Sequence, residues 1–290
     1  MTDTINQIFT GLSIASILLL ISLGLAIIYG TMGVINLAHG EFVMLGAYSV
    51  WFLQTFFGIG LISCLLLVFL IVGTIGWLVE RSLIQFLYRR PLDTILATWG
   101  VGVVFQQAVR LSAGAELRYV KMPNWLSTAV SVSGMDFSAY RIFVMVLTIA
   151  LLVVTYVLIF RTSFGMRLRA VTQNPDIAKC FGINASQVYS LTFAYGAGLA
   201  GLAGALVSPL KSVSPDMGTS YVVDAFMVVV VGGVQSLLGT VASAGALGEI
   251  SGGLAYLTND TLAKALVFFG VVILIRFRPQ GLFAVKMRRG

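Results

Sequence analysis

Long uncharged runs of apolar residues alternate with short polar segments along almost the whole chain. Most of these runs approach the roughly 20 residues that an α-helix needs to cross a bilayer. The last run becomes long enough if Lys264, at its start, extends its ammonium group toward the lipid headgroups. The pattern therefore predicts spanning helices over residues 12–29, 59–79, 94–109, 142–160, 187–210, 225–248 and 265–275.

Two parts of the chain leave the number of crossings open. Residues 33–57 carry Asn36, His39 and Glu41 among apolar neighbours, which predicts a broken or re-entrant helix. Residues 221–275 are long enough for three crossings. We therefore predict an all-α, polytopic transmembrane bundle with eight or nine spanning helices, forming one domain over residues 1–290.

The composition excludes a water-soluble globular protein. Hydrophobic residues make up 58% and charged residues 10% of the chain, against roughly 45–50% and about 25% in ordinary globular domains. The mean hydropathy is +0.98, and continuous apolar runs indicate helices rather than the alternating pattern of a barrel. The partner that surrounds most of the chain is therefore the lipid bilayer.

The basic residues indicate an orientation. The net charge is +7, but Lys and Arg lie in short segments between apolar runs, where they set topology rather than bind nucleic acid. Twelve of the 18 fall within residues 81–90, 161–179 and 276–289, and six fall in the alternate segments. Because cytoplasmic loops carry the excess, we predict that residues 161–186 and the C-terminus are cytoplasmic.

Several motifs predict neither a cofactor nor a metal. Cys64 lies in an apolar run and Cys180 in a polar loop, so a disulfide framework or metal site is not indicated. Residues 196–201 match the dinucleotide pattern GxGxxG, but they lie inside an apolar run with no preceding strand, which is typical of a helix-packing stripe. The chain has no GxxxxGK[ST] loop for binding ATP.

Glu41 is the most exceptional position, because an acid near the centre of a spanning helix costs roughly 2.5–3.5 kcal/mol on insertion scales. With Asn36 and His39 it forms a polar patch bounded by Gly33 and Gly40. On a continuous helix Asn36 and Gly40 would share one face. One interpretation is a kinked half-helix lining a polar pathway. In the alternative, Glu41 caps a helix end at the interface. His39, the only histidine, is interpreted as a structural hydrogen-bonding residue rather than a proton relay.

Residues 161–186 contain a second distinct pattern. Asn174 is a good N-cap, Pro175 suits the first helical position and Asp176 favours the positive end of the helix dipole. A short helix is therefore predicted from Pro175 to about Phe181, ending at Gly182. Such a helix can bind a cytoplasmic partner protein, or it can rest on lipid headgroups.

These patterns resemble the branched-chain amino acid permease family of ABC importers. Asp176-Ile-Ala178-x-x-x-Gly182 has the EAAxxxG spacing of the coupling loop in ABC importer permeases. Residues 232–235 read Gly-Gly-Val-Gln, so Gln235 stands where the family pattern Gly-Gly-Val-Gly has its last glycine. The resemblance covers nearly the whole chain, through the segments 33–48, 161–170, 232–239 and 278–283; segments 90–100, 124–126 and 221–230 resemble the urea branch of the family.

The resemblance implies a transport subunit of the bacterial inner membrane that is not an enzyme. Its implied partners are a second related permease, two cytoplasmic ATPase subunits and a periplasmic substrate-binding protein. Residues 161–186 would be the coupling loop. The expected coupling residues are Arg169, Asn174, Asp176, Ala178 and Gly182; the expected substrate-pathway residues are Asn36, His39, Glu41, Tyr48 and Thr98.

Urea is the substrate that the sequence favours, because a small neutral solute needs only donors and acceptors such as Asn36, Thr98 and Tyr48. A zwitterion would require compensating charges or helix ends in the pathway. The alternative is a permease for branched-chain or other small amino acids or amides. A passive channel or an ion-coupled carrier would have no use for the coupling loop. An intramembrane enzyme is disfavoured, because the chain has no HExxH or nucleophile motif.

Overall fold

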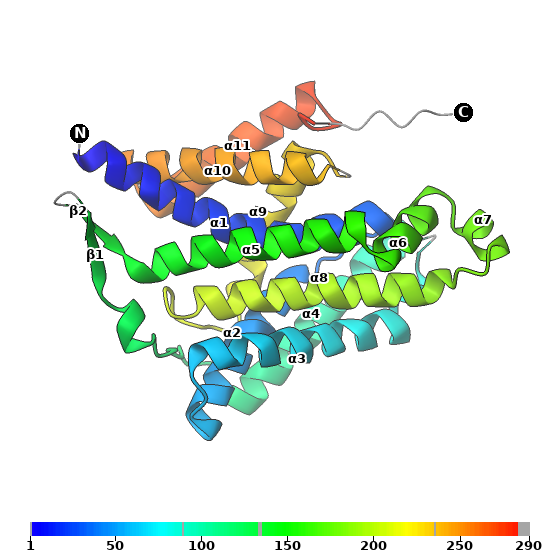
Figure 1. The fold of residues 1–290 in the computed structure, drawn as a ribbon, viewed down its shortest axis with the longest axis horizontal. Helices are drawn as coiled ribbons and strands as arrows, with labels where there is room; N and C mark the ends of the chain where they lie inside the picture. The colour runs from blue at the N-terminus through cyan, green and yellow to red at the C-terminus, as the bar shows by residue number, and fades with distance from the viewer. Residues whose placement is uncertain (1, 89, 133–134, 235, 284–290) are drawn as a thin grey trace.

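A computed structural model describes residues 2–88, 90–132, 135–234 and 236–283. Helices dominate this part of the chain, and α3, α5 and α8 run along its longest dimension (Figure 1). Nine of the helices in the described ranges have 16 residues or more. These are α1 (Thr2–Met32), α2 (His39–Phe57), α3 (Leu61–Ser82), α4 (Pro91–Ala113), α5 (Ala139–Arg161), α8 (Ala185–Val207), α9 (Met217–Gly232), α10 (Leu237–Leu257) and α11 (Asp260–Phe277).

Five described helices are long and apolar enough to cross a membrane: α1, α3 together with the residues up to Phe86, α4, α5 and α8. The shorter helix α9 is also apolar. The all-α, polytopic prediction is confirmed, whereas the count of eight or nine crossings stays a prediction.

Residues 221–275 belong to three helices, as their length predicted. The expected single run over 225–248 is wrong, because Gly233 adopts a φ of 90° and separates α9 from α10. Gln235 lies outside the described residues.

The predicted break between α1 and α2 is present. Gly33 has a φ of 65°, which ends α1, and the backbone stays non-helical until α2 begins at His39. Asn36 therefore lies ahead of the helix and does not share a helical face with Gly40. Glu41 lies in the first turn of α2.

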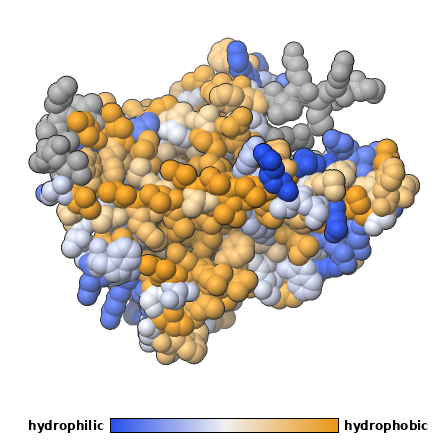
Figure 2. Space-filling view, viewed as in Figure 1, coloured by the Kyte–Doolittle hydropathy of each residue, from blue (hydrophilic) through white to orange (hydrophobic). Residues whose placement is uncertain are grey.

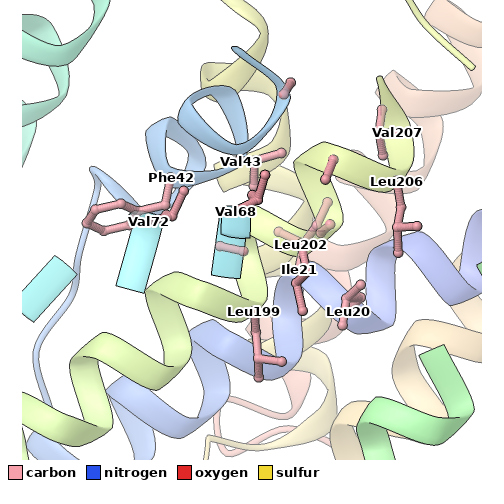
Figure 3. Close-up of a cluster of buried hydrophobic side chains, with 14 of the residues drawn as sticks. Leu20, Ile21, Phe42, Val43, Val68, Val72, Leu199, Leu202, Leu206 and Val207 are labelled. Atoms are coloured by element: carbon pink, nitrogen blue, oxygen red, sulfur yellow. The ribbon is translucent and has the colours of Figure 1, made fainter. Parts of the chain in front are cut away.

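Helix α8 forms the centre of the core, and it packs against α1, α2 and α3. Its small residues bring the backbones of these helices together: a side chain at Gly204 would overlap the carbonyl of Val43, and one at Gly201 would overlap Val72. This confirms residues 196–204 as a packing stripe within a helix. Figure 3 shows apolar side chains from all four helices meeting here, among them Ile21, Val68 and Leu202.

The outer surface is mostly apolar. Figure 2 shows hydrophobic side chains over the middle of one face, with hydrophilic ones gathered toward its ends. Helix α5 is 17% buried and α4 is 22% buried over their most apolar windows, so both present large faces to lipid or to another membrane subunit. The sequence did not predict the two-stranded antiparallel hairpin of β1 (Ala129–Val132) and β2 (Met135–Ser138), in which Ala129 pairs with Ser138.

Two short helices project at the opposite end of the bundle from this hairpin (Figure 1). Residues predicted as loop form α6 (Ser163–Gln173), because the Thr162 hydroxyl accepts a hydrogen bond from the backbone N–H of Gly165 at 3.2 Å. The predicted second helix is α7 (Pro175–Cys180), and it is confirmed with its cap. A separate small core holds both helices against α8, through Leu168, Val171, Ala178, Ala185 and Val188.

Candidate functional site

A polar cluster surrounds Glu41 where the first turn of α2 faces α4 and α9. The Glu41 side chain is buried, at 4% exposure, and its Oε1 atom accepts a hydrogen bond of 2.9 Å from Nε2 of Gln106. The other oxygen, Oε2, is buried without a hydrogen-bond partner among the described residues. It lies over Gly218 of α9, where a Cβ atom would come within 2.6 Å of it. Glu41 therefore keeps one acceptor available inside the bundle.

One face of α4 carries the groups that hold this cluster together. Thr98, Gly102, Gln106 and Arg110 follow one another at intervals of four residues, which places them in a row along the helix. Their partners come from the break and from α9: the N–H of Leu37 donates to Thr98 at 3.1 Å, Gln106 contacts Thr219 at 3.3 Å, and Arg110 pairs with Asp216. Gly102 lets the aliphatic part of Glu41 approach α4.

Sequence reasoning found Thr98 but missed the rest of this row, which we call the α4 stripe (Thr98, Gly102, Gln106 and Arg110). The spacing of four polar or small residues within an apolar helix was the available signal. Gln106 and Arg110 have partners at the start of α9, Thr219 and Asp216, that lie more than 100 residues further along the chain. They could not be identified without the packing of α4 against α9.

Asn36 and Thr98 both support the broken backbone next to Glu41. Asn36 is fully buried, and its Oδ1 atom accepts a hydrogen bond of 3.0 Å from the N–H of Ala38. Its Nδ2 atom has no hydrogen-bond partner within the part of the chain that the structure describes. Thr98 accepts from Leu37 and donates to the carbonyl of Thr94 at 2.8 Å. These two side chains satisfy backbone groups that the missing helical turn leaves free.

His39 and Tyr48 lie outside this cluster. The Nε2 atom of His39 is 3.0 Å from the carbonyl oxygen of Ile21, so this side chain joins α2 to α1 and supports the structural interpretation. Tyr48 lies two turns beyond Glu41, and its ring packs edge-to-face on Trp51, which Arg118 covers from 4.9 Å. The five predicted pathway residues therefore fall into one group of three, Asn36, Glu41 and Thr98, and two separate positions.

Replacing Thr98 with valine is expected to destabilise the protein, because the Leu37 N–H would lose its acceptor in a buried setting. The cost of such a group is about 1–3 kcal/mol. Thr148 is a matched control, since it is also buried and its hydroxyl has no hydrogen-bond partner among the described residues. Thermal unfolding in detergent should show a lower midpoint for Thr98→Val than for Thr148→Val. Equal midpoints would contradict the role of Thr98.

The predicted coupling residues occupy α6, α7 and the turn after them. Asn174 accepts from the backbone N–H groups of Asp176 and Ile177 at 3.0 and 3.1 Å, as predicted for an N-cap. Asp176 forms an exposed ion pair with Lys179 at 3.2 Å. Gly182 has a φ of 77° and ends the helix with no atom near the place a side chain would take.

Two of the predicted coupling residues make contacts within the protein, one of them buried and the other exposed. Ala178 is 3% exposed and belongs to the small core beneath α7. Arg169 donates to the carbonyl of Ile159, at the end of α5, and its guanidinium lies 5.6 Å from the ring centre of Phe160. The exposed large apolar residues of α7 and the turn after it are Ile177 and Phe181, at 56% and 81% exposure. Sequence reasoning did not single them out as contact residues.

A buried carboxylate lies behind these helices. Glu80, at the end of α3, is fully buried and accepts hydrogen bonds from the hydroxyls of Tyr88 and Ser190. Burial, followed by the hydrogen bond from Tyr88 to Glu80 and the negative charge of Glu80, raises the pKa of the Tyr88 phenol. The cluster joins α3 to the start of α8, and α8 follows directly on α7. It therefore links the projecting helices to the core.

Apolar helices, a buried polar cluster at a helix break and a projecting helical pair define a multi-pass membrane protein of the transporter class. The chain belongs to the branched-chain amino acid ABC permease family, because the model described as "Branched-chain amino acid transport system / permease component" matches residues 7–276. The homologues and the apolar helices place it in the inner membrane as a transport component.

Known relatives cover nearly the whole chain. It is 29% identical to the high-affinity branched-chain amino acid transport system permease protein BraD of Pseudomonas aeruginosa, over 96% of this chain and 95% of BraD. It is 27% identical to LivH of Escherichia coli, over 93% and 92% of the two chains. It is 25% identical to LivM of Salmonella typhimurium, over 92% of this chain and 67% of LivM. No solved structure matches the chain significantly.

These relatives bear on the substrate. The description of the family and the names of the three relatives all refer to branched-chain amino acid transport. They favour the amino-acid alternative over the urea interpretation that the sequence segments suggested.

Proposed function

We propose that this chain is the translocation subunit of an ATP-driven importer for branched-chain amino acids. Membership of the permease family carries the proposal. The projecting helices α6 and α7 support it, because Ile177 and Phe181 offer apolar contacts to a cytoplasmic ATPase. Two ATPase subunits would supply the free energy that switches the bundle between outward-open and inward-open states. The whole of residues 1–290 acts as one permease domain, with residues 161–186 as its coupling loop.

The remaining partners follow from the same proposal. LivH and LivM of Salmonella typhimurium are both named permease proteins of a high-affinity branched-chain amino acid transport system, and this chain is similar to each. A second related permease therefore completes the bundle here, through the exposed faces of helices such as α4 and α5. A periplasmic binding protein delivers the solute to the end of the bundle that carries β1 and β2.

Within the bundle, the solute passes the group formed by Asn36, Glu41 and Thr98. The polar atoms available there are Oε2 of Glu41 and Nδ2 of Asn36, one acceptor and one donor. An α-ammonium group suits the carboxylate, and the positive charge of Arg110 is already balanced by Asp216. A free acid with no competing cation supports a solute that carries a positive group.

Urea is the second candidate, and one observation favours it. Two of the segments that resemble the urea branch, 90–100 and 221–230, lie on α4 and α9, the helices that enclose Glu41. Uptake of labelled leucine and labelled urea by cells carrying or lacking this chain, with its partner subunits, separates the candidates. Leucine uptake that requires the chain supports the proposal, and urea uptake alone supports the second candidate. Uptake of neither by an assembled complex would contradict both.

The orientation predicts how Cys180 reacts. With α6, α7 and the C-terminus in the cytoplasm, a membrane-impermeant thiol reagent should miss Cys180 in intact spheroplasts and label it after permeabilisation. Cys180 is exposed, whereas Cys64 is buried and serves as an internal control. Labelling of intact spheroplasts would overturn the orientation. Arg89 and the tail residues Lys286, Arg288 and Arg289, which contributed to this prediction, lie outside the described residues.

Replacing Gly182 with valine is expected to reduce uptake at least tenfold while the complex still assembles. A left-handed conformation costs a residue with a side chain roughly 1–2 kcal/mol, so the turn after α7 would rearrange. Gly58 offers a matched control, because it has a φ of 65°, equally free surroundings and a position after α2 at the other end of the bundle. Co-purification of the ATPase and ATP-dependent leucine uptake in proteoliposomes measure the two effects. Equal uptake by Gly182→Val and Gly58→Val would count against coupling through α7.

A further inference from the structure

A cavity of about 240 Å³ opens between α1, α5, α9, α10 and α11, away from the polar cluster around Glu41. Its inner wall is apolar, with Leu18, Met227, Val228, Leu247 and Val267 among the lining residues. Apolar surface of this kind is stabilised when hydrocarbon covers it. The inner part of the cavity therefore suits an aliphatic chain.

The mouth of the cavity is basic. Arg141 lies in the first turn of α5, and Lys211 lies shortly after the end of α8, so both belong to the end of the bundle opposite α7. Neither side chain has an ion pair or a hydrogen bond with another residue in the described ranges. Two cations at the rim of an apolar cavity suit a group with negative charge and several acceptor oxygens.

The acids of the cavity do not balance these two cations. Asp224 is 9% exposed, and its Oδ2 atom lies 2.8 Å from Nζ of Lys264, so this acid already has a cationic partner. Asp260 is exposed in the first turn of α11, where it interacts favourably with the helix dipole. A zwitterionic amino acid would need a free buried acid for its ammonium group. An anionic amphiphile needs only the two basic side chains and the apolar wall.

We propose that this cavity binds an anionic phospholipid, whose phosphate group contacts Arg141 and Lys211 and whose acyl chain enters between α1, α9 and α11. The two parts of the ligand match the two parts of the cavity. Basic pockets between membrane helices recognise phosphate headgroups in the same way. A free phosphate ion would satisfy the rim alone and leave the apolar wall uncovered.

The first test measures lipid retained by the assembled transporter. The complex is reconstituted in nanodiscs of equal parts phosphatidylglycerol and phosphatidylcholine, extracted in mild detergent, and its bound lipids are counted by mass spectrometry. We expect at least threefold enrichment of phosphatidylglycerol over phosphatidylcholine. Equal retention of the two lipids would overturn the proposal. The test uses the wild-type complex alone, so it does not depend on whether a variant folds.

The second test locates the bound lipid. Arg141→Gln combined with Lys211→Gln should lower the retained phosphatidylglycerol at least threefold. Ser251→Phe, which fills the cavity from α10 and keeps its charges, should do the same. Lys121→Gln is the matched control, because it removes one charge at the same end of the bundle outside the cavity. Retention by the double variant equal to that of Lys121→Gln would overturn the assignment.

The third test distinguishes which ligand the cavity binds: an anionic lipid, a free phosphate ion or an amino acid. Wild-type complex stripped of lipid is heated with short-chain phosphatidylglycerol, with inorganic phosphate or with leucine. Phosphatidylglycerol alone should raise the unfolding midpoint, and the double variant should lose that increase. Protection by inorganic phosphate equal to that by the lipid would make this an anion site. Protection by leucine that depends on Arg141 and Lys211 would make it an amino-acid site, and either outcome overturns the lipid proposal.

Discussion

A Gly204→Leu substitution is expected to abolish the folded protein. Gly204 lies where α8 crosses α2, and a Cβ atom there would overlap the carbonyl group of Val43. About one turn further along α2, Gly46 meets the backbone of Gly201 in the same way. Backbone atoms inside a packed bundle cannot move aside as a flexible side chain can. Overpacking costs typically 1–3 kcal/mol where side chains give way, and contact with backbone should exceed the upper end of that range.

The measurement is the amount of monodisperse complex recovered from membranes. Gly245 is a suitable control, because it lies within α10 and a Cβ atom there would have no neighbour within 4 Å. Gly245→Ala should be recovered in full, and it should even gain roughly 0.5–1 kcal/mol from the higher helix propensity of alanine. Recovery of Gly204→Leu at the level of Gly245→Ala would show that α2 and α8 do not meet at this position.

A Gln106→Leu substitution is expected to reduce leucine uptake at least tenfold. The variant removes the donor to Oε1 of Glu41, and Oε2 has no hydrogen-bond partner among the described residues. A hydrogen bond to a charged group contributes about 1.5–3 kcal/mol, so a carboxylate left without one would shift its position or bind a proton. Either change alters the acid that we place in the solute pathway.

Gln107 provides the control for this prediction, since it is the neighbouring glutamine but faces outward from α4. Gln107→Leu should transport normally. Combining Gln106→Leu with Glu41→Gln removes the unpaired charge, so this double variant should unfold at a higher temperature than Gln106→Leu alone. If Gln106→Leu and Gln107→Leu transport equally well, the Glu41 cluster is structural and the solute passes elsewhere. If Glu41→Gln alone keeps full uptake, the charge of Glu41 is not needed.

The two experiments examine different aspects of one arrangement. The packing of α2 against α8 holds the first turn of α2 inside the bundle, and the α4 stripe closes over it. Gly40 and Gly218 let α2 and α9 approach each other beside Glu41. The polar cluster therefore depends on three backbone approaches that only glycine permits, which explains why a substitution at Gly204 should affect the site as well as the fold.

Local patterns were sufficient for most of the secondary structure. In lipid, a spanning segment must form all of its backbone hydrogen bonds within the protein. Each long apolar run was therefore expected to form an α-helix. The cap at Asn174 and the end of α7 at Gly182 depend on atoms within a few residues of each other, and both were predicted correctly. The hairpin of β1 and β2 lacked such a signal, because strands of four residues are too short for a clear alternation.

The sequence by itself determined the class of fold, the break at Gly33 and the capped helix α7, because each of these depends on local backbone chemistry or on the length of apolar runs. Only the tertiary structure decided which polar groups meet. It joined Gln106 to Glu41 and Arg110 to Asp216, turned Arg169 toward the end of α5, and separated His39 and Tyr48 from the cluster. These contacts connect residues that are far apart in the chain, and they depend on how far each helix is rotated about its axis. Apolar periodicity does not define that rotation in a bilayer, where both the lipid and the neighbouring helices are apolar.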